Sequence, residues 1–202
     1  MSDTPLTHSD NQEPTAFTQA QLEWLPWLPP LPEDELTDRH CAGLVDAARA
    51  KSPYFRLLAR DPDTLGARTR SDKDIFYNPD AGLPRAEREL SATATSRFNG
   101  CIYCASVHAR FASHFSHREG DVQRLLDEGV SADLGPRWNA IVAASAALSA
   151  TPSDFGPEHI DGLRAVGLDD YAIADALQGA AFFNWANRLM LSLGEPQLQV
   201  GG

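Results

Sequence analysis

The chain has 202 residues, of which 43% are hydrophobic and 22% are charged, as in an ordinary globular protein. This length favours a single domain and allows a sizeable core. The formal net charge of −11 repels phosphate backbones and anionic membrane surfaces, so we expect neither nucleic acid nor a membrane as a partner.

Membrane insertion and secretion are also disfavoured. No uncharged stretch approaches the roughly 20 strongly apolar residues of a membrane span. The first 18 residues lack the basic flank and apolar core of a signal peptide. The three cysteines are an odd number, which argues against a secreted disulfide scaffold. We therefore expect a cytoplasmic protein, and in that reducing compartment paired cysteines are more often catalytic or metal-binding than structural.

The N-terminal part of the chain divides into two segments. Residues 1–16 are polar and show no periodicity, which predicts a disordered tail in front of a single domain spanning 17–202. Residues 22–32 alternate Trp and Leu with four prolines, which exclude a helix and a central strand. We expect an extended strap lying on the domain or on a neighbouring subunit. The alternative is a polyproline ligand for an aromatic groove.

From Glu33 onward the pattern is helical, with no convincing strand, so we predict an all-α fold. In chain order, the expected helices cover residues 34–51, 53–61, 62–78, 84–99, 101–117, 119–128, 136–150, 157–166 and 169–193. A glycine follows several of them, which is a common stop signal. We expect Cys41, Trp138 and Tyr171 to be core residues, and residues 182–185 to lie in the core or in a subunit interface.

A group of three reactive side chains follows the Asn99-Gly100 break. Cys101, Cys104 and His108 stand at i, i+3 and i+7, which places them on one face of a helix. Cys101 would lie in the first turn, where free backbone N–H groups and the helix dipole stabilise a thiolate. A thiolate is the nucleophile that attacks peroxides and disulfides.

Two further groups could supply proton transfer. His108 lies one turn beyond Cys104, and an imidazole can take or give a proton near neutral pH. Glu89 is on the preceding helix. A short connection would let the two helices pack against each other, and the Glu89 carboxylate could then relay a proton or orient His108.

The same residues allow other interpretations. The cysteine pair could bind zinc together with His108 and a fourth ligand, His114 or His117. One helical face, however, spreads its ligands poorly for a tetrahedral site. The two cysteines could also be plain core residues. A thioredoxin-like site would need a βαβ unit, for which this chain offers no strands.

The spacing of the motif resembles that of the alkylhydroperoxidase D (AhpD) family, within the carboxymuconolactone decarboxylase superfamily. That pattern begins with a glutamate, which eleven residues separate from a Cys-x-x-Cys pair. A histidine then follows after three more residues. Glu89, Asn99-Gly100, Cys101, Cys104 and His108 match it. The C-terminal residues 182–194 also resemble the end of peroxidase-related members.

The resemblance implies an AhpD-like all-α bundle that assembles into a homo-oligomer, a trimer or hexamer, with a dimer also possible. It implies a thiol-dependent peroxidase of antioxidant defence, regenerated by a thiol or dithiol reductant protein, with no cofactor and no metal. Cys104 would attack the peroxide, Cys101 would resolve the product as a disulfide, and Glu89 and His108 would relay protons. One departure is Tyr103, which stands where well-known members carry a second histidine.

Two other functions stay open. The pair could form a redox sensor or binding protein without turnover. Alternatively, His108 and Glu89 could act as acid and base on a small carbonyl substrate, as in the decarboxylase relatives.

Overall fold

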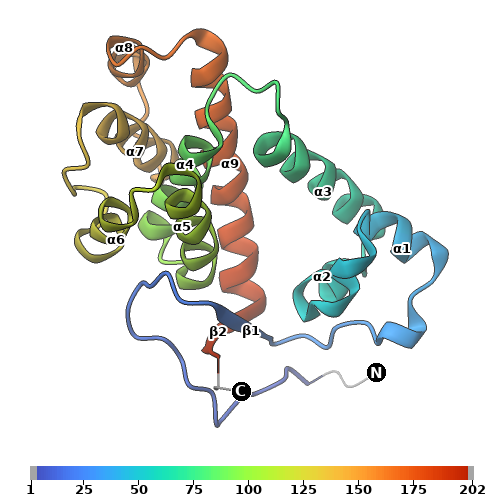
Figure 1. Cartoon of the computed structure of the whole chain (residues 1–202). Helices are drawn as coiled ribbons and strands as arrows, with labels where there is room; N and C mark the ends of the chain where they lie inside the picture. Colours follow the sequence, from blue (N-terminus) through green and yellow to red (C-terminus); the bar gives the residue numbers. More distant parts are fainter. Residues whose placement is uncertain (1–3, 200–202) are drawn as a thin grey trace.

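The computed structural model describes residues 4–199, which form a helical bundle with one small antiparallel sheet (Figure 1). The all-α class is confirmed. In chain order the elements are β1 (Leu22–Pro26), η1 (Glu33–Glu35), α1 (Asp38–Leu44), η2 (Ala47–Lys51), α2 (Pro53–Leu58), α3 (Pro62–Tyr77), α4 (Arg85–Asn99), α5 (Ile102–Ser116), α6 (Glu119–Glu128), α7 (Pro136–Ser149), α8 (Pro157–Ala165), α9 (Asp170–Leu193) and β2 (Gly194–Leu198).

Helix α4 forms the centre of the bundle and packs against α5, α7 and α9 (Figure 1). Every residue from 87 to 96 of this helix is buried. Most of them are Ser, Ala or Thr, whose short side chains let the neighbouring helices approach closely. A Cβ atom on Gly179 of α9 would lie 2.6 Å from the hydroxyl oxygen of Ser91, so this contact between α4 and α9 requires a glycine.

Helices α4 and α5 are joined by a very tight turn. Gly100 adopts the left-handed conformation, with φ 81° and ψ 11°, and ends α4. Such a conformation strains residues that carry a Cβ. The chain reverses there, and Cys101 becomes the N-cap residue of α5. The two helices therefore pack side by side.

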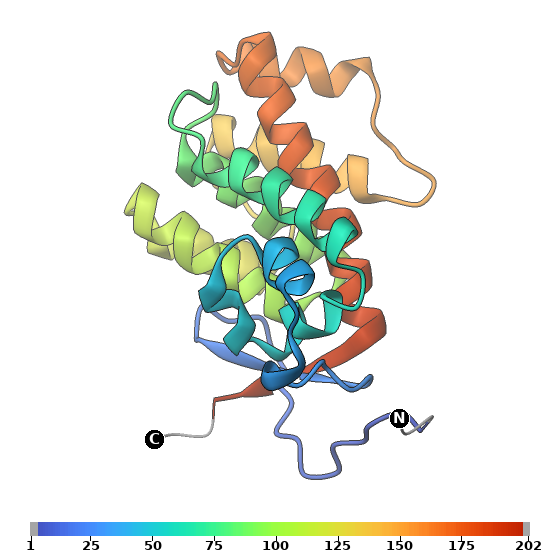
Figure 2. The ribbon, with the colours of Figure 1, turned by 90° about the vertical axis from the view of Figure 1, so that its right-hand side faces the viewer.

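Helices α1 to α3 form an arm beside the bundle. Helix α3 contacts α4 and α9, and Figure 2 shows it lying across α9. The prediction of one helix over 34–51 is wrong, because the segment divides into η1, α1 and η2. Val45 has a positive φ of 64°, which ends α1. Leu44 is then buried in a small separate core with Ala59 and Leu65.

Two short strands from the N-terminal and C-terminal parts of the described chain form the sheet at the bottom of Figure 1. Strand β1 pairs with β2 antiparallel, from Leu22 opposite Leu198 to Pro26 opposite Gly194. A strand after Glu33 was not expected, so that prediction is wrong for β2. Both strands are edge strands, which is why they tolerate proline.

The segment before β1 is extended and hydrogen-bonded within the residues that the structure describes. The Leu6 N–H donates to the Trp27 carbonyl at 2.8 Å, and the Leu198 N–H donates to the Gln12 carbonyl at 2.8 Å. The expectation of disorder for 1–16 therefore does not hold for residues 6–12, because the sheet offers free backbone groups on which they dock. The expectation also included residues 1–3, which lie outside the described residues.

The strap expected at residues 22–32 lies on its own domain, where Leu22 and Trp24 are buried. Of the expected core residues, Trp138 is buried, while Cys41 and Tyr171 are exposed, so the prediction is wrong for these two. Over residues 4–199, no helix has the length and apolar character needed to cross a bilayer.

Candidate active site

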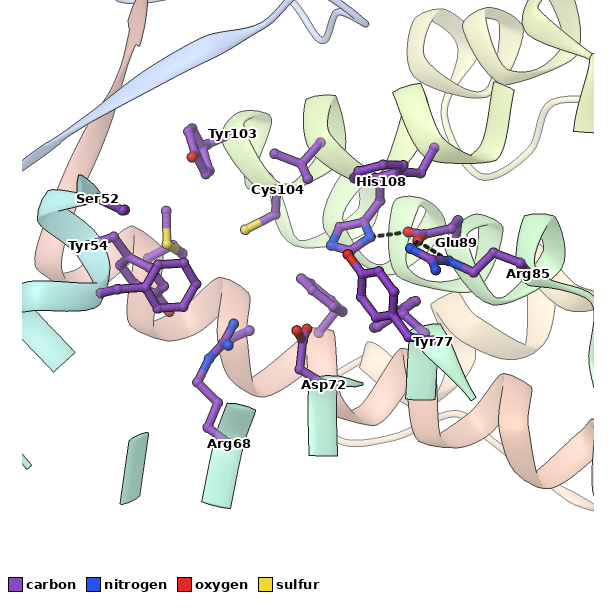
Figure 3. A pocket seen from close by; sticks show the side chains of 17 residues that line it. Ser52, Tyr54, Arg68, Asp72, Tyr77, Arg85, Glu89, Tyr103, Cys104 and His108 are labelled. Atoms are coloured by element: carbon purple, nitrogen blue, oxygen red, sulfur yellow. Dashed lines mark hydrogen bonds and ion pairs between the residues drawn. The ribbon is translucent and has the colours of Figure 1, made fainter. Parts of the chain in front are cut away.

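A cavity of about 180 Å³ opens between the α2–α3 arm and helices α4, α5 and α9 (Figure 3). Its wall is mainly aromatic and aliphatic. The polar side chains that line it come from different elements: Ser52, Tyr54, Arg68, Asp72, Tyr77, Arg85, Glu89, Tyr103, Cys104 and His108. An apolar cavity with a few converging polar groups is the usual form of a small-molecule site.

The two cysteines of the motif lie side by side at the start of α5. Their sulfur atoms are 2.9 Å apart and hydrogen-bonded, and both residues are free thiols. Both are almost fully buried. Cys104 lines the main cavity, whereas Cys101 lines a second, smaller cavity of about 70 Å³ beneath Trp24 and Gly194 of the sheet. A molecule in the main cavity therefore meets Cys104.

The two thiols differ in acidity. The hydrogen bond with Cys104 lowers the pKa of Cys101 below the ordinary thiol value. Burial, together with the neighbouring sulfur of Cys101, raises the pKa of Cys104 well above it. The negative charge of the pair is consequently favoured on Cys101, and Cys104 needs a base close by to lose its proton.

A candidate base lies one turn further along α5. The Nδ1 atom of His108 is 2.5 Å from Oε2 of Glu89, which reaches across from α4. Both side chains are buried. The His108 ring is held between Phe183, at 3.9 Å between ring centroids, and Phe76, at 5.2 Å. In Figure 3 the second nitrogen of the imidazole is turned towards the Cys104 side of the cavity.

The other oxygen of the Glu89 carboxylate is held by Arg85, one turn earlier on α4. The Arg85 Nε and Nη2 atoms both contact Oε1, at 2.6 Å and 2.5 Å. The guanidinium in turn lies over the ring of Tyr77 at 4.1 Å. Each carboxylate oxygen thus has its own partner, and Glu89 fixes both the position and the tautomer of His108.

Asn187 of α9 supports the cysteine pair from the opposite side. It is fully buried, donates to the Ser96 hydroxyl at 3.0 Å and accepts from Asn99 at 3.1 Å. Its amide lowers the pKa of both Cys101 and Cys104. A fixed amide dipole at this place stabilises a thiolate on either sulfur.

Tyr103, between the two cysteines, lines both cavities. Burial raises its pKa above the ordinary tyrosine value. The ring therefore keeps its proton at neutral pH, so it can donate a hydrogen bond but cannot act as a base there.

The remaining histidines lie elsewhere. His114 and His117 line a separate hollow with Gln19 and Arg110. Over residues 4–199, no cluster of three His, Cys, Asp or Glu residues is arranged to hold a metal ion. His40 and His159 accept hydrogen bonds at the N-termini of α1 and α8, in agreement with a capping role.

The structure brings together all four candidate residues that the sequence indicated: Glu89, Cys101, Cys104 and His108. Sequence reasoning missed Arg85, Arg68 and Asn187. The four-residue spacing from Arg85 to Glu89 was a usable signal, since such pairs meet on a helix. Asn187 was detectable as a polar residue in an otherwise apolar helix. Nothing in the local sequence marked Arg68.

Comparison with known proteins agrees with this fold. Residues 62–147 match the carboxymuconolactone decarboxylase family. This match includes the four candidate site residues. Among curated protein sequences, none matches this chain.

Several solved structures are similar. One is the alkylhydroperoxidase AhpD core of an uncharacterized peroxidase-related protein from Ralstonia eutropha JMP134, with a TM-score of 0.70 and 23% identity over 82% of this chain and 88% of that one. Another is an uncharacterized peroxidase-related protein from Silicibacter sp. TM1040, with a TM-score of 0.68 and 22% identity over 95% of this chain and 96% of that one. The debrominase Bmp8 has a TM-score of 0.68 and 19% identity over 85% of this chain and 91% of that one.

The family match covers the α3–α7 region, and the solved structures extend the same helical fold over most of the chain. The chain therefore has an AhpD-like helical fold, and its residues 62–147 are similar to the carboxymuconolactone decarboxylase family.

Proposed function

We propose that this protein is a thiol-dependent peroxidase that reduces hydroperoxides with the Cys101–Cys104 pair. The observation that carries the proposal is the position of Cys104. Its thiol faces an apolar cavity on one side, contacts a second thiol at 2.9 Å on another, and lies one helical turn from a histidine held by a buried carboxylate. These are a nucleophile, a resolving group and a proton carrier at one point.

The first step oxidises Cys104. His108 takes the proton of the Cys104 thiol through its free ring nitrogen, and the thiolate attacks the terminal oxygen of a hydroperoxide. A bond forms between sulfur and that oxygen while the O–O bond breaks. His108 returns its proton to the departing alkoxide. The products are an alcohol and a sulfenic acid on Cys104.

The second step closes the pair. The sulfur of Cys101 attacks the sulfur of Cys104, the S–S bond forms, and hydroxide leaves as water with the proton that Cys101 gave up. Two thiols and one hydroperoxide thus become one disulfide, one alcohol and one water. The lowered pKa of Cys101 favours its thiolate over that of an ordinary cysteine. A thiol or dithiol reductant protein then restores both thiols, which suits a reducing cytoplasm and a role in antioxidant defence.

Turnover of tert-butyl hydroperoxide with dithiothreitol tests the proposal. We expect wild-type protein and Cys41→Ser to turn over at the same rate, and Cys104→Ser to be inactive. Cys101→Ser should still form a sulfenic acid on Cys104 that dimedone traps, but without turnover through an internal disulfide. A sulfenic acid that instead forms on Cys101 in Cys104→Ser would reverse the two roles.

The same assay separates the alternatives. A redox sensor would form one disulfide per chain but would consume peroxide only slowly in the presence of dithiothreitol. An acid–base enzyme of the decarboxylase type would keep its activity in a variant lacking both Cys101 and Cys104. The debrominase Bmp8, which shares this fold, has also been solved in complex with 2,3,4-tribromopyrrole. A brominated pyrrole is therefore worth including among the test substrates, because a dithiol that gives two electrons to a peroxide can give them to another electrophile.

A further inference from the structure

Arg68 is a buried cation that the proposed chemistry does not use. It lies on α3, is only 8% exposed, and lines the same cavity as Cys104. Its Nε and Nη1 atoms are buried without a hydrogen-bond partner. In Figure 3 its guanidinium points into the cavity from the side opposite to His108. An unpaired charge away from water is costly, so this group is suited to receiving an anion.

Neither carboxylate of the cavity neutralises Arg68. Glu89 is held by Arg85 and His108. Asp72, one turn beyond Arg68 on α3, is paired with Arg49 at 3.2 Å. Both carboxylates that line the cavity therefore already have cationic or hydrogen-bonding partners, and Nε and Nη1 of Arg68 remain without one.

Aromatic rings hold the guanidinium in place. Its central carbon lies 5.2 Å from the ring centroid of Phe182, 5.5 Å from that of Phe55 and 5.8 Å from that of Tyr54. Such contacts position an arginine without using its N–H groups. The hydroxyl of Tyr54 is also buried without a hydrogen-bond partner. Burial raises the pKa of Tyr54 to about 12, so this hydroxyl remains a donor at neutral pH.

We propose that Arg68 and Tyr54 form an anion subsite, and that the substrate is a small organic hydroperoxide carrying a carboxylate. The carboxylate would accept hydrogen bonds from both side chains while the hydroperoxy group lies at Cys104. The size of the cavity, about 180 Å³, is below the 300–1,000 Å³ of most ligand pockets, which limits the substrate to a small molecule. This inference rests on the proposed function for its reaction, but the anion subsite does not.

The test compares two hydroperoxides that differ only in the carboxylate: tert-butyl hydroperoxide and 3-hydroperoxy-3-methylbutanoate. Arg68 also lowers the pKa of Cys104 through its charge, so a single rate would mix two effects. The ratio of the two kcat/KM values removes the effect on the thiol. We expect the wild-type protein to favour the carboxylated substrate about tenfold or more, as a hydrogen-bonded charge pair allows.

Substitutions of Arg68 and Tyr54 test whether the anion subsite causes this preference. Arg68→Met should bring the ratio of kcat/KM values to within about twofold of one, and Tyr54→Phe should reduce it less, since it removes one neutral donor. Arg70→Met is the matched control, because Arg70 lies on the same helix but is exposed and outside the cavity. The control should keep the wild-type ratio. A preference that survives Arg68→Met, or a wild-type protein without preference, would overturn the proposal.

A binding measurement separates this inference from the proposed function. Isothermal titration of reduced protein with 3-hydroxy-3-methylbutanoate, the unreactive alcohol, needs no turnover. Binding that Arg68→Met abolishes and Arg70→Met retains supports the anion subsite. If such binding occurs while neither hydroperoxide is reduced, the peroxidase function fails and the subsite stands. If both hydroperoxides are reduced but the alcohol does not bind, the subsite fails and the peroxidase function stands.

Discussion

Glu89 and His108 are 19 residues apart in the chain, yet their side chains are joined by a hydrogen bond of 2.5 Å between Oε2 and Nδ1. The tight turn at Gly100 makes this possible, because it places α4 and α5 side by side. A buried imidazole whose Nδ1 is held by a carboxylate presents its other nitrogen in a fixed direction. That direction is towards the cavity onto which Cys104 opens.

The first prediction concerns proton transfer. Glu89→Gln and His108→Gln should each slow sulfenic acid formation on Cys104 at least about tenfold, since general acid–base catalysis contributes about 10²–10⁴-fold. The double variant should be little slower than the slower single variant, because the two groups act as one unit. Stopped-flow measurement of Trp fluorescence after mixing with peroxide gives the rate.

Glu87→Gln is a suitable control for this experiment. Glu87 lies on the same helix, but its carboxylate is paired with Arg137, away from the cysteines. We expect it to oxidise at the wild-type rate. If Glu89→Gln and His108→Gln also oxidise at that rate, the two residues have only a structural role.

The second prediction concerns stability. Arg85→Met should lower the free energy of unfolding by about 2–3 kcal/mol, because it leaves one oxygen of a buried carboxylate without its charged partner. His108 still binds the other oxygen, which limits the loss. Glu89→Gln in the Arg85→Met background should recover part of it. Urea unfolding of the two single variants and the double variant measures this coupling, and strictly additive losses would contradict it.

The third prediction concerns the disulfide. Mild oxidation with one equivalent of peroxide should link Cys101 to Cys104, because the two sulfur atoms are already in contact. Cys41 is exposed on α1 and should remain a free thiol. Peptide mapping by mass spectrometry identifies the bridge. A main product that contains Cys41 would remove the pair from its proposed role.

The fourth prediction concerns pH. In a Cys41→Ser background, absorbance at 240 nm should show one thiolate forming below the ordinary thiol pKa and the other only well above it. A lowered pKa keeps Cys101 ionised at pH values where an ordinary thiol is already protonated, and this thiolate is lost as the pH falls through the lowered pKa. Iodoacetamide at neutral pH should therefore modify Cys101 before Cys104.

Asn187 provides the matching variant, because its amide lowers the pKa of both thiols. Asn187→Leu should move both ionisation steps to higher pH. Asn184→Leu is the control, since Asn184 also accepts a hydrogen bond from Asn99 but is not among the groups that shift the pKa of either cysteine. Equal titration curves for the two variants would show that Asn187 does not act on the pair.

The fifth prediction concerns assembly. Part of the apolar surface of residues 22–32 and 182–185 is covered within the chain, since Trp24 and Phe183 are buried. Helices α5 and α9 nevertheless leave Phe115, Trp185 and Leu191 each more than 40% exposed. We expect a homo-oligomer built through these helix faces, which light scattering at micromolar concentration would detect. A monomer under these conditions would refute the expectation.

Local patterns were enough to predict most of the helices. The predicted helix at 169–193 agrees with α9 within one residue, and the predicted helix at 119–128 matches α6, because their stop signals are single residues such as Gly129 and Gly194. The segment 34–51 was predicted incorrectly. Its composition permits one helix, but the burial of Leu44 in its own small core and the positive φ of Val45 divide it.

The sequence by itself determined the cysteine motif, its helical face, and the pairing of Glu89 with His108 across a short turn, because all of these depend on spacings along two adjacent helices. Only the tertiary structure decided what surrounds them. Arg68 from α3 and Asn187 from α9 reach the pair from distant parts of the chain. Strand β2 likewise forms only because β1 lies beside it to share backbone hydrogen bonds, and no local pattern records such a neighbour.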